Sequence, residues 1–205
     1  MNPESLMMTH GYKPELSEGA VKCPVFQTST FVFKTAEEGK AFFEIAYGLR
    51  DKEPKEELGL IYSRINNPNL EILENRLCLW DKADDCAVFE SGMSAISTVL
   101  LEFLKPGDLL VYSNPTYGGT DHFINHFLDK IGVHTLGILP GQSEESIIDA
   151  IDATGYAKNL AMIYLETPAN PTNHLVDINA LKVNVVDYYS KINNKEVLLT
   201  VDNTY

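Results

Sequence analysis

The sequence predicts an α/β protein whose mostly parallel sheet is covered by helices on both faces. From Asn69 onward, short apolar runs alternate with segments whose apolar residues have helical spacing, the pattern typical of such sheets. The apolar runs are nearly continuous, as expected for strands that are buried on both faces. Polar, small or aromatic residues follow four of these runs. Ligands of parallel α/β sheets bind beyond the carboxyl ends of the strands, so we look for the site there.

Composition bounds the class of protein. The chain has 205 residues, 44% of them hydrophobic, enough for one sizeable core or a large part of a bigger domain. Its formal net charge of −13 argues against nucleic acid as a partner. The three cysteines have no C-x-x-C spacing, and no apolar run approaches the roughly 20 residues of a membrane span. Because the start also lacks a signal-peptide pattern, we expect a cytoplasmic protein without membrane or metal partners.

The N-terminal third is predicted to be irregular before the first periodic helix. Residues 1–30 lack periodicity and are expected to form an extended arm, and residues 51–57, "DKEPKEE", a solvated charged loop. Residues 69–81 are expected to be a helix. Its apolar residues at helical spacing are Leu70, Leu73, Leu77 and Trp80.

The remaining elements alternate between strand and helix. Strands are expected over 86–90, 108–113, 132–139, 160–166 and 196–202. Helices are expected over 91–104, 120–130, 143–153 and 177–192. Pro106-Gly107 ends the first of these helices, because neither residue favours a helix interior.

Ser91-Gly92-Met93 joins a predicted strand directly to a helix. Small residues there leave backbone N–H groups free to approach an anion, and the helix N-terminus favours negative charge. The same residues also fit an ordinary N-cap, in which Ser91 accepts hydrogen bonds from the first amides. The motif alone does not choose between the two interpretations.

Two further strand ends carry residues with two interpretations each. Tyr117 stands between a proline and Gly118-Gly119, so its phenol either projects into a cleft or lies half on the surface of a turn. Asn170 stands between prolines in "TPANP", which is typical of a rigid turn and also suits a fixed hydrogen-bonding side chain.

Charged residues complete the candidate set. Asp202 follows a mostly apolar strand, and its carboxylate either caps the following turn or is held for a cationic ligand. Tyr62 and Arg64 precede the first periodic helix. A guanidinium suits a phosphate group, although a lone arginine is more often a solvated charge. A dinucleotide-binding domain is disfavoured, because no G-x-G-x-x-G follows the first predicted strand.

Six motifs taken in order resemble the Cys/Met-metabolism family of pyridoxal-phosphate enzymes, which includes cystathionine γ-synthase, cystathionine lyases, methionine γ-lyase and the O-acylhomoserine sulfhydrylases. The likeness runs from about Thr9 to the last residue. The motifs are "FQTSTFVF" (26–33), "YSRINNP" (62–68), "SGMSAI" (91–96), "TYGGT" (116–120), "ETPANP" (166–171) and "VDNTY" (201–205).

The resemblance implies pyridoxal 5'-phosphate as cofactor and a role for each candidate. Ser91, Gly92 and Met93 would bind the cofactor phosphate, Asn170 the ring hydroxyl oxygen, and Asp202 the ring nitrogen. Tyr117 would stack on the ring and move protons, which makes it a catalytic residue together with Asp202. Tyr62 and Arg64 would reach the phosphate in the neighbouring subunit's active site. The active unit would then be at least a dimer, and the family resemblance suggests a tetramer.

The resemblance also implies a fold and an activity. The fold would be the aspartate-aminotransferase-like, type I pyridoxal-phosphate fold, with residues 1–65 as an arm that serves the neighbouring subunit and 66–205 as the first part of the large cofactor domain. The family's cofactor-carrying lysine would follow Tyr205, so the chain is expected to be truncated.

Cystathionine γ-synthase-like chemistry at the γ-carbon of a homoserine ester or cystathionine is the first expectation for the activity. Methionine γ-lyase, O-acylhomoserine sulfhydrylase and a catalytically silent cofactor-binding fragment are the alternatives. Gly119 stands where methionine γ-lyases carry a cysteine, Asn69 stands where a threonine is usual, and the segment between Phe33 and Tyr62 is longer than in typical members.

Overall fold

The computed structural model describes residues 2–54, 56 and 58–205. The chain forms two compact units, Met1–Val88 and Phe89–Tyr205, so the first periodic helix belongs to the first unit. The expected division after residue 65, which concerns roles rather than compactness, stays a prediction. No helix in the described part of the chain is long and apolar enough to cross a membrane.

The first unit is mostly helix and irregular chain. The described part of its arm contains a short helix α1, Pro3–Leu6, and a 3₁₀ turn η1, Pro14–Ser17. The longer helices are α2, Ala36–Ala46, and α3, Pro68–Asp81. Helix α3 confirms the predicted helix over 69–81, whereas α2 was not predicted. The sequence does contain a helix-start signal, Thr35 followed by Glu38. The Thr35 side chain accepts a hydrogen bond from the Glu38 amide, and the Glu38 carboxylate accepts one from the Lys34 amide. This arrangement is close to a capping box.

Asn69 fastens the arm to the start of α3. Its side chain accepts a hydrogen bond from the Phe26 amide (3.1 Å) and donates one to the Phe26 carbonyl (3.0 Å). An amide side chain carries an acceptor oxygen and an NH₂ donor side by side, so it can pair with both polar groups of one backbone residue. The structure therefore gives Asn69 a definite role at the position where a threonine was expected.

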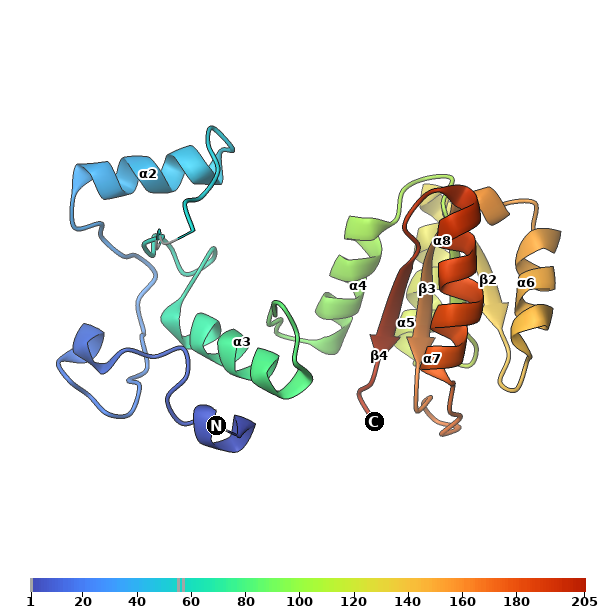
Figure 1. Cartoon of the computed structure of the whole chain (residues 1–205), viewed down its shortest axis with the longest axis horizontal. Coiled ribbons are helices and arrows are strands. Elements are labelled where there is room, and N and C mark those ends of the chain that lie inside the picture. Colours follow the sequence, from blue (N-terminus) through green and yellow to red (C-terminus); the bar gives the residue numbers. More distant parts are fainter. Residues whose placement is uncertain (1, 55, 57) are drawn as a thin grey trace. The chain divides into compact units, whose positions relative to one another are not determined.

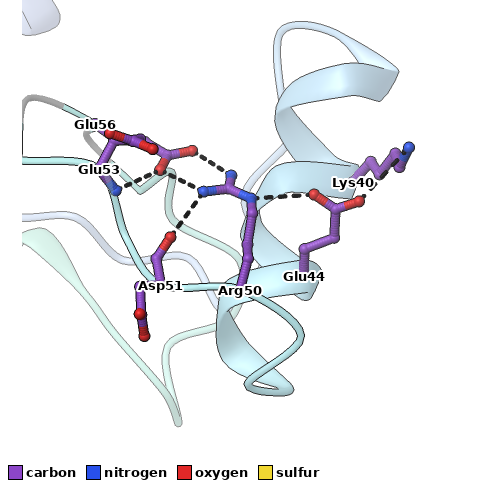
Figure 2. A network of polar contacts seen from close by, with 6 residues as sticks. All are labelled: Lys40, Glu44, Arg50, Asp51, Glu53 and Glu56. Carbon is purple, nitrogen blue, oxygen red and sulfur yellow. Dashed lines mark hydrogen bonds and ion pairs between the residues drawn. The ribbon is translucent and has the colours of Figure 1, made fainter.

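The charged loop is organised by one arginine (Figure 2). The Arg50 guanidinium donates two hydrogen bonds to the Glu56 carboxylate, at 2.9 and 2.6 Å, and one to Glu44. These bonds to Arg50 hold the pKa of Glu56 down at about 2. The described part of the predicted loop has no helix or strand and is largely exposed, which confirms the prediction and shows how a solvated segment keeps a defined course.

The second unit is built on a parallel sheet (Figure 1). Its strands are β1 Leu109–Ser113, β2 His134–Ile138, β3 Leu160–Glu166 and β4 Leu198–Asp202. Their order is β2-β1-β3-β4, and each neighbouring pair is parallel. The register pairs Glu166 with Asp202 at the ends of β3 and β4. Since all strands run in one direction, their carboxyl ends meet at one edge.

Helices cover both faces of this sheet (Figure 1). They are α4 Gly92–Phe103, α5 Gly118–Phe123, α6 Glu144–Ala153, α7 Ile178–Leu181 and α8 Asp187–Asn193. Helix α5 continues through a π-helical turn, η2 Ile124–Leu128, and a 3₁₀ turn, η3 Asp129–Ile131. A second π-helical turn, η5 Lys182–Val186, joins α7 to α8, and a 3₁₀ turn, η4 Ala157–Asn159, precedes β3.

Each face of the sheet has its own apolar core. Leu109 and Val111 pack with α6 and the α7–α8 segment, while Leu110 and Tyr112 pack with α4 and α5. Side chains alternate between the faces along a strand, so a strand covered on both faces is apolar throughout. The predicted two-sided sheet, its helices and four of its five strands are thereby confirmed.

The predicted strand over 86–90 is wrong. This segment forms neither a strand nor a helix. The Cys86 amide donates to the Asp85 carboxylate and the Val88 amide donates to the Glu74 carboxylate. Side chains thus satisfy amides that a strand would use for its ladder. An apolar run of five residues shows β propensity, but only a neighbouring strand makes it part of a sheet.

Candidate active site

A cleft of about 460 Å³ opens at the carboxyl edge of the sheet, within the second unit. This volume lies in the roughly 300–1,000 Å³ range of small-molecule sites. All six sequence-predicted site residues of the second unit line it, together with Glu166 and three others. The predicted residues are Ser91, Gly92, Met93, Tyr117, Asn170 and Asp202.

One end of the cleft is the N-terminus of α4, a helix of 12 residues. The Ser91 side chain accepts a hydrogen bond from the Ser94 amide at 3.1 Å, so the N-cap interpretation holds. It leaves the anion site open as well: among the described residues, no hydrogen bond is made by the amides of Gly92 and Met93. A Cβ added to Gly92 would meet no atom within 4 Å. The amides therefore remain approachable from the cleft.

The other end of the cleft carries the Asp202 carboxylate. One oxygen accepts a hydrogen bond from the Tyr164 hydroxyl at 3.1 Å, and the other accepts from the amide (3.1 Å) and hydroxyl (2.5 Å) of Thr204. In the described part of the chain, no lysine or arginine forms an ion pair with it. These neutral donors fix the position of the carboxylate and leave its charge for a cationic group.

Tyr164 lies almost fully buried beneath Asp202. Burial, followed by the negative charge of Asp202 and the hydrogen bond to it, raises the pKa of Tyr164 well above its usual value of 10.0. The phenol therefore stays protonated at neutral pH, as its hydrogen bond to Asp202 requires. Sequence reasoning placed Tyr164 in a strand and missed this role. The signal was a polar atom two residues before the end of an otherwise apolar strand.

Tyr117 is half-exposed and lines the cleft at the start of α5. Gly119 lies against it. A Cβ added to Gly119 would stand 2.7 Å from the ring carbon Cε1 of Tyr117 and 2.9 Å from Met93 Sδ, both closer than atoms pack. At Gly118, the same addition would meet nothing within 4 Å. The two glycines therefore differ: a side chain at the second would require the Tyr117 ring and the Met93 side chain to shift.

Glu166 lines the cleft as well, and sequence reasoning assigned it no role. Its carboxylate is buried, and it accepts hydrogen bonds from the Thr116 hydroxyl (2.6 Å), the Tyr117 amide (2.6 Å) and the Asn170 amide (2.7 Å). Asn170 reaches the cleft as a result, with its backbone fixed by Glu166. A buried carboxylate at a strand end was visible in the sequence, but its partners were not.

Tyr62 and Arg64 lie side by side in the first unit. The arm passes beside them, since the Phe31 amide bonds to the Ile61 carbonyl and the Ser63 amide to the Ser29 carbonyl. The Arg64 guanidinium carbon is 5.6 Å from the centroid of the Tyr62 ring, a cation–π contact. Both side chains are exposed. Their assigned role across a subunit boundary stays a prediction.

The fold and the cleft define a protein of the type I pyridoxal-phosphate class. A family model described as "Cys/Met metabolism PLP-dependent enzyme" matches residues 4–205. The chain belongs to this family, which confirms the resemblance and, at the level of the family, the expected cofactor and enzyme class.

Relatives and solved structures agree with this membership. The chain is 36% identical over 189 residues to an L-methionine gamma-lyase of Fusobacterium nucleatum, a match that covers 91% of the chain and 42% of the relative. It is 29% identical to the sulfhydrylase FUB7 of Fusarium oxysporum, covering 99% of the chain and 42% of that protein. The chain thus spans less than half the length of these curated relatives.

Two solved structures are similar to this chain in fold, and one of them contains a pyridoxyl-lysine phosphate group. The crystal structure of a Campylobacter jejuni protein, assigned as an O-acetylhomoserine (thiol)-lyase and carrying N'-pyridoxyl-lysine-5'-monophosphate, matches with a TM-score of 0.78 and 26% identity over 99% of this chain and 44% of that one. The metB structure from Corynebacterium glutamicum matches with a TM-score of 0.75 and 26% identity, over 99% and 45% of the two chains. The predicted type I fold is confirmed.

The residues of the cleft fit pyridoxal phosphate. The free amides at the start of α4 suit the phosphate, and the open space at Gly92 lets it approach. The unpaired charge of Asp202 suits the protonated ring nitrogen. The half-exposed Tyr117 ring suits a stacked aromatic partner.

Gly119→Ala is expected to displace the Tyr117 ring, because the new methyl group overlaps the present position of that ring. The affinity of the full-length protein for pyridoxal phosphate should fall by about 2- to 13-fold, as when a stacking contact of about 0.5–1.5 kcal/mol is lost. Gly118→Ala is the matched control, since its methyl group meets open space. Fluorescence titration with the cofactor measures both; equal affinities for the two variants would contradict the steric role of Gly119.

Tyr164→Phe is expected to lower the free energy of unfolding by about 0.5–1.5 kcal/mol at neutral pH, because Asp202 loses a donor. The raised pKa of Tyr164 also predicts how the stability of the wild-type protein depends on pH. Above about pH 10 the unfolded chain releases the tyrosine proton while the folded protein retains it, so this contribution to wild-type stability declines as pH rises. Between about pH 9 and pH 11, Tyr164→Phe should therefore lose less stability than the wild-type protein does. Urea unfolding across this range tests it, and parallel alkaline declines would exclude the proposed linkage.

Proposed function

We propose that the full-length protein is a pyridoxal-phosphate-dependent lyase or transferase of sulfur amino-acid metabolism. The observation that carries the proposal is the cleft itself. Six residues predicted from four separate sequence motifs line one cavity at the carboxyl edge of the sheet, with amides for an anion at one end and a carboxylate for a cation at the other. Family membership supports the same reaction class.

Each residue has a definite task in this proposal. When bound, the cofactor draws electrons away from the substrate α-carbon, and it does so best with a protonated ring nitrogen. Asp202 holds that proton by its charge, and Tyr164 and Thr204 hold Asp202. The amides of Gly92 and Met93 would bind the phosphate. Tyr117 would cover the ring and move a proton at its hydroxyl, while the Asn170 side chain would bond to the ring oxygen.

The proposed substrate is an amino acid that reacts at its γ-carbon. Cystathionine γ-synthase-like use of a homoserine ester or cystathionine remains our first assignment, and Gly119 supports it over methionine γ-lyase because methionine γ-lyases carry a cysteine at this position. The 36% identity to an L-methionine gamma-lyase supports methionine as the alternative, and the sulfhydrylase relative supports a homoserine ester with sulfide. Turnover with O-acetyl-L-homoserine, L-cystathionine and L-methionine in parallel separates these branches.

Asp202→Asn and Asp202→Ala test the proposed function. Both remove the charge that holds the ring proton, and the first retains the shape of the side chain. We expect kcat to fall by at least about 10²-fold, the scale of one preorganised electrostatic group. Asp149→Asn, an exposed change of equal charge on α6, is the control. A wild-type protein that binds the cofactor without turning over any substrate would instead be a silent cofactor-binding module. Failure to bind the cofactor would refute the proposal.

We also propose that the active unit is a dimer with two-fold symmetry in which Tyr62 and Arg64 complete the partner's cleft, with a tetramer of two such dimers as the full assembly. The paired, exposed Tyr62 and Arg64 side chains support this, because a guanidinium held against an aromatic ring is available to a phosphate from outside its own unit. Three free cysteines fit a reducing compartment, and we place the protein in the cytoplasm.

Subunit complementation tests the shared site. Full-length Arg64→Ala and Asp202→Ala proteins should each be nearly inactive. In a mixed dimer one site carries both defects and the other carries neither, so random exchange should restore about a quarter of wild-type sites. If Arg64 served its own subunit, every site would keep one defect. Absence of recovery after verified exchange would then reassign Tyr62 and Arg64.

A further inference from the structure

The buried carboxylate of Glu166 connects two loops that approach the cleft from different strands. Its Oε2 accepts hydrogen bonds from the hydroxyl of Thr116 and the amide of Tyr117, which follow β1. Its Oε1 accepts a hydrogen bond from the amide of Asn170, which follows β3. The Glu166 amide donates to Ser113 at the end of β1, at 2.8 Å, so strand and side chain are both anchored.

The hydrogen-bond donors around the buried Glu166 carboxylate are all uncharged groups. Glu166 is 4% exposed, and no arginine or lysine in the described part of the chain forms an ion pair with it. Neutral donors alone therefore compensate the burial of the carboxylate. A buried charge is tolerated only where hydrogen bonds surround it, so the donors of both loops are tied to one point.

We propose that Glu166 is a positioning residue that sets the places of Tyr117 and Asn170 in the cleft together. It acts through their backbone amides rather than on the reacting atoms. The proposal rests on the proposed function for its consequence in catalysis, but its structural content is independent of any cofactor. Loosening one carboxylate would release both the stacking ring and the amide side chain.

A carboxylate is required because of its acceptor geometry. All three partners are donors towards it, and two of them are backbone amides that cannot accept. A glutamine of the same shape has only one acceptor oxygen, so its NH₂ group must face an amide N–H from one loop or the other. The Glu166→Gln change is therefore nearly isosteric, yet it must break one of the two attachments.

Amide hydrogen exchange of the full-length protein without cofactor is the primary test. In Glu166→Gln, the amides of Tyr117 and Asn170 should exchange at least about tenfold faster, while those of β1 and α4 remain at wild-type rates. The neighbouring prolines at 115, 168 and 171 lack amides, so the peptides that cover these loops report few other sites. Glu196→Gln, an exposed carboxylate beside β4, is the matched control and should change neither loop.

Thr116 provides a second, milder variant if Glu166→Gln does not fold. Thr116→Val removes one of the donors without a change in shape and should speed exchange at Tyr117, whereas Thr116→Ser keeps the hydroxyl and should restore it. Equal exchange at Tyr117 in these two variants would overturn the proposal. So would unchanged exchange at both loops in Glu166→Gln, or a rise spread evenly over the whole unit.

With pyridoxal phosphate added, the visible circular dichroism of the bound cofactor should change in Glu166→Gln, because Tyr117 no longer fixes its ring, and kcat should fall by about tenfold or more. A wild-type protein that fails to bind the cofactor would refute the proposed function and leave the exchange result standing. Local exchange that rises while dichroism and kcat remain at wild-type values would overturn the positioning role.

Discussion

Parallel pairing of β3 with β4 is the constraint on which the site depends. It places Glu166 directly across from Asp202 at the carboxyl edge, so two carboxylates of different purpose lie in one cleft. Glu166 is buried, and its carboxylate accepts hydrogen bonds from three donors of the protein itself. Asp202 is also held by hydrogen bonds, but its charge is left for a cation. A slip of one residue in the register would turn one of them to the other face of the sheet.

The cleft separates charge along its length. Helix α4 presents free amides and the positive end of its dipole at one end, and Asp202 presents negative charge at the other. A ligand that carries an anion and a cation at its two ends is bound by both, and pyridoxal phosphate is such a ligand. The protein supplies position and charge, and the cofactor supplies the reactive chemistry.

The two units differ in how their chain is held. The second unit depends on two apolar cores, one on each face of a sheet. The first unit depends more on polar attachments: Asn69 ties the arm to α3, and Arg50 ties the longer segment before Tyr62 to α2 through Glu44 (Figure 2). Such surface attachments contribute little stability each. They do give a defined course to the segment that leads to Tyr62 and Arg64.

The sequence by itself determined the class of sheet, because strands buried on both faces must be apolar throughout, and it located the cleft residues, because strand ends of a parallel sheet share an edge. It also determined the family through six motifs in order. Tertiary structure alone decided three matters. Residues 86–90 form no strand, and the Cys86 and Val88 amides donate instead to the carboxylates of Asp85 and Glu74. A Cβ at Gly119 would come within 2.9 Å of the Tyr117 and Met93 side chains, so these would have to shift. Glu166 became the anchor of two loops because its donors come from positions 49, 50 and 4 residues away, and distances along the chain do not reveal which groups meet in a folded site.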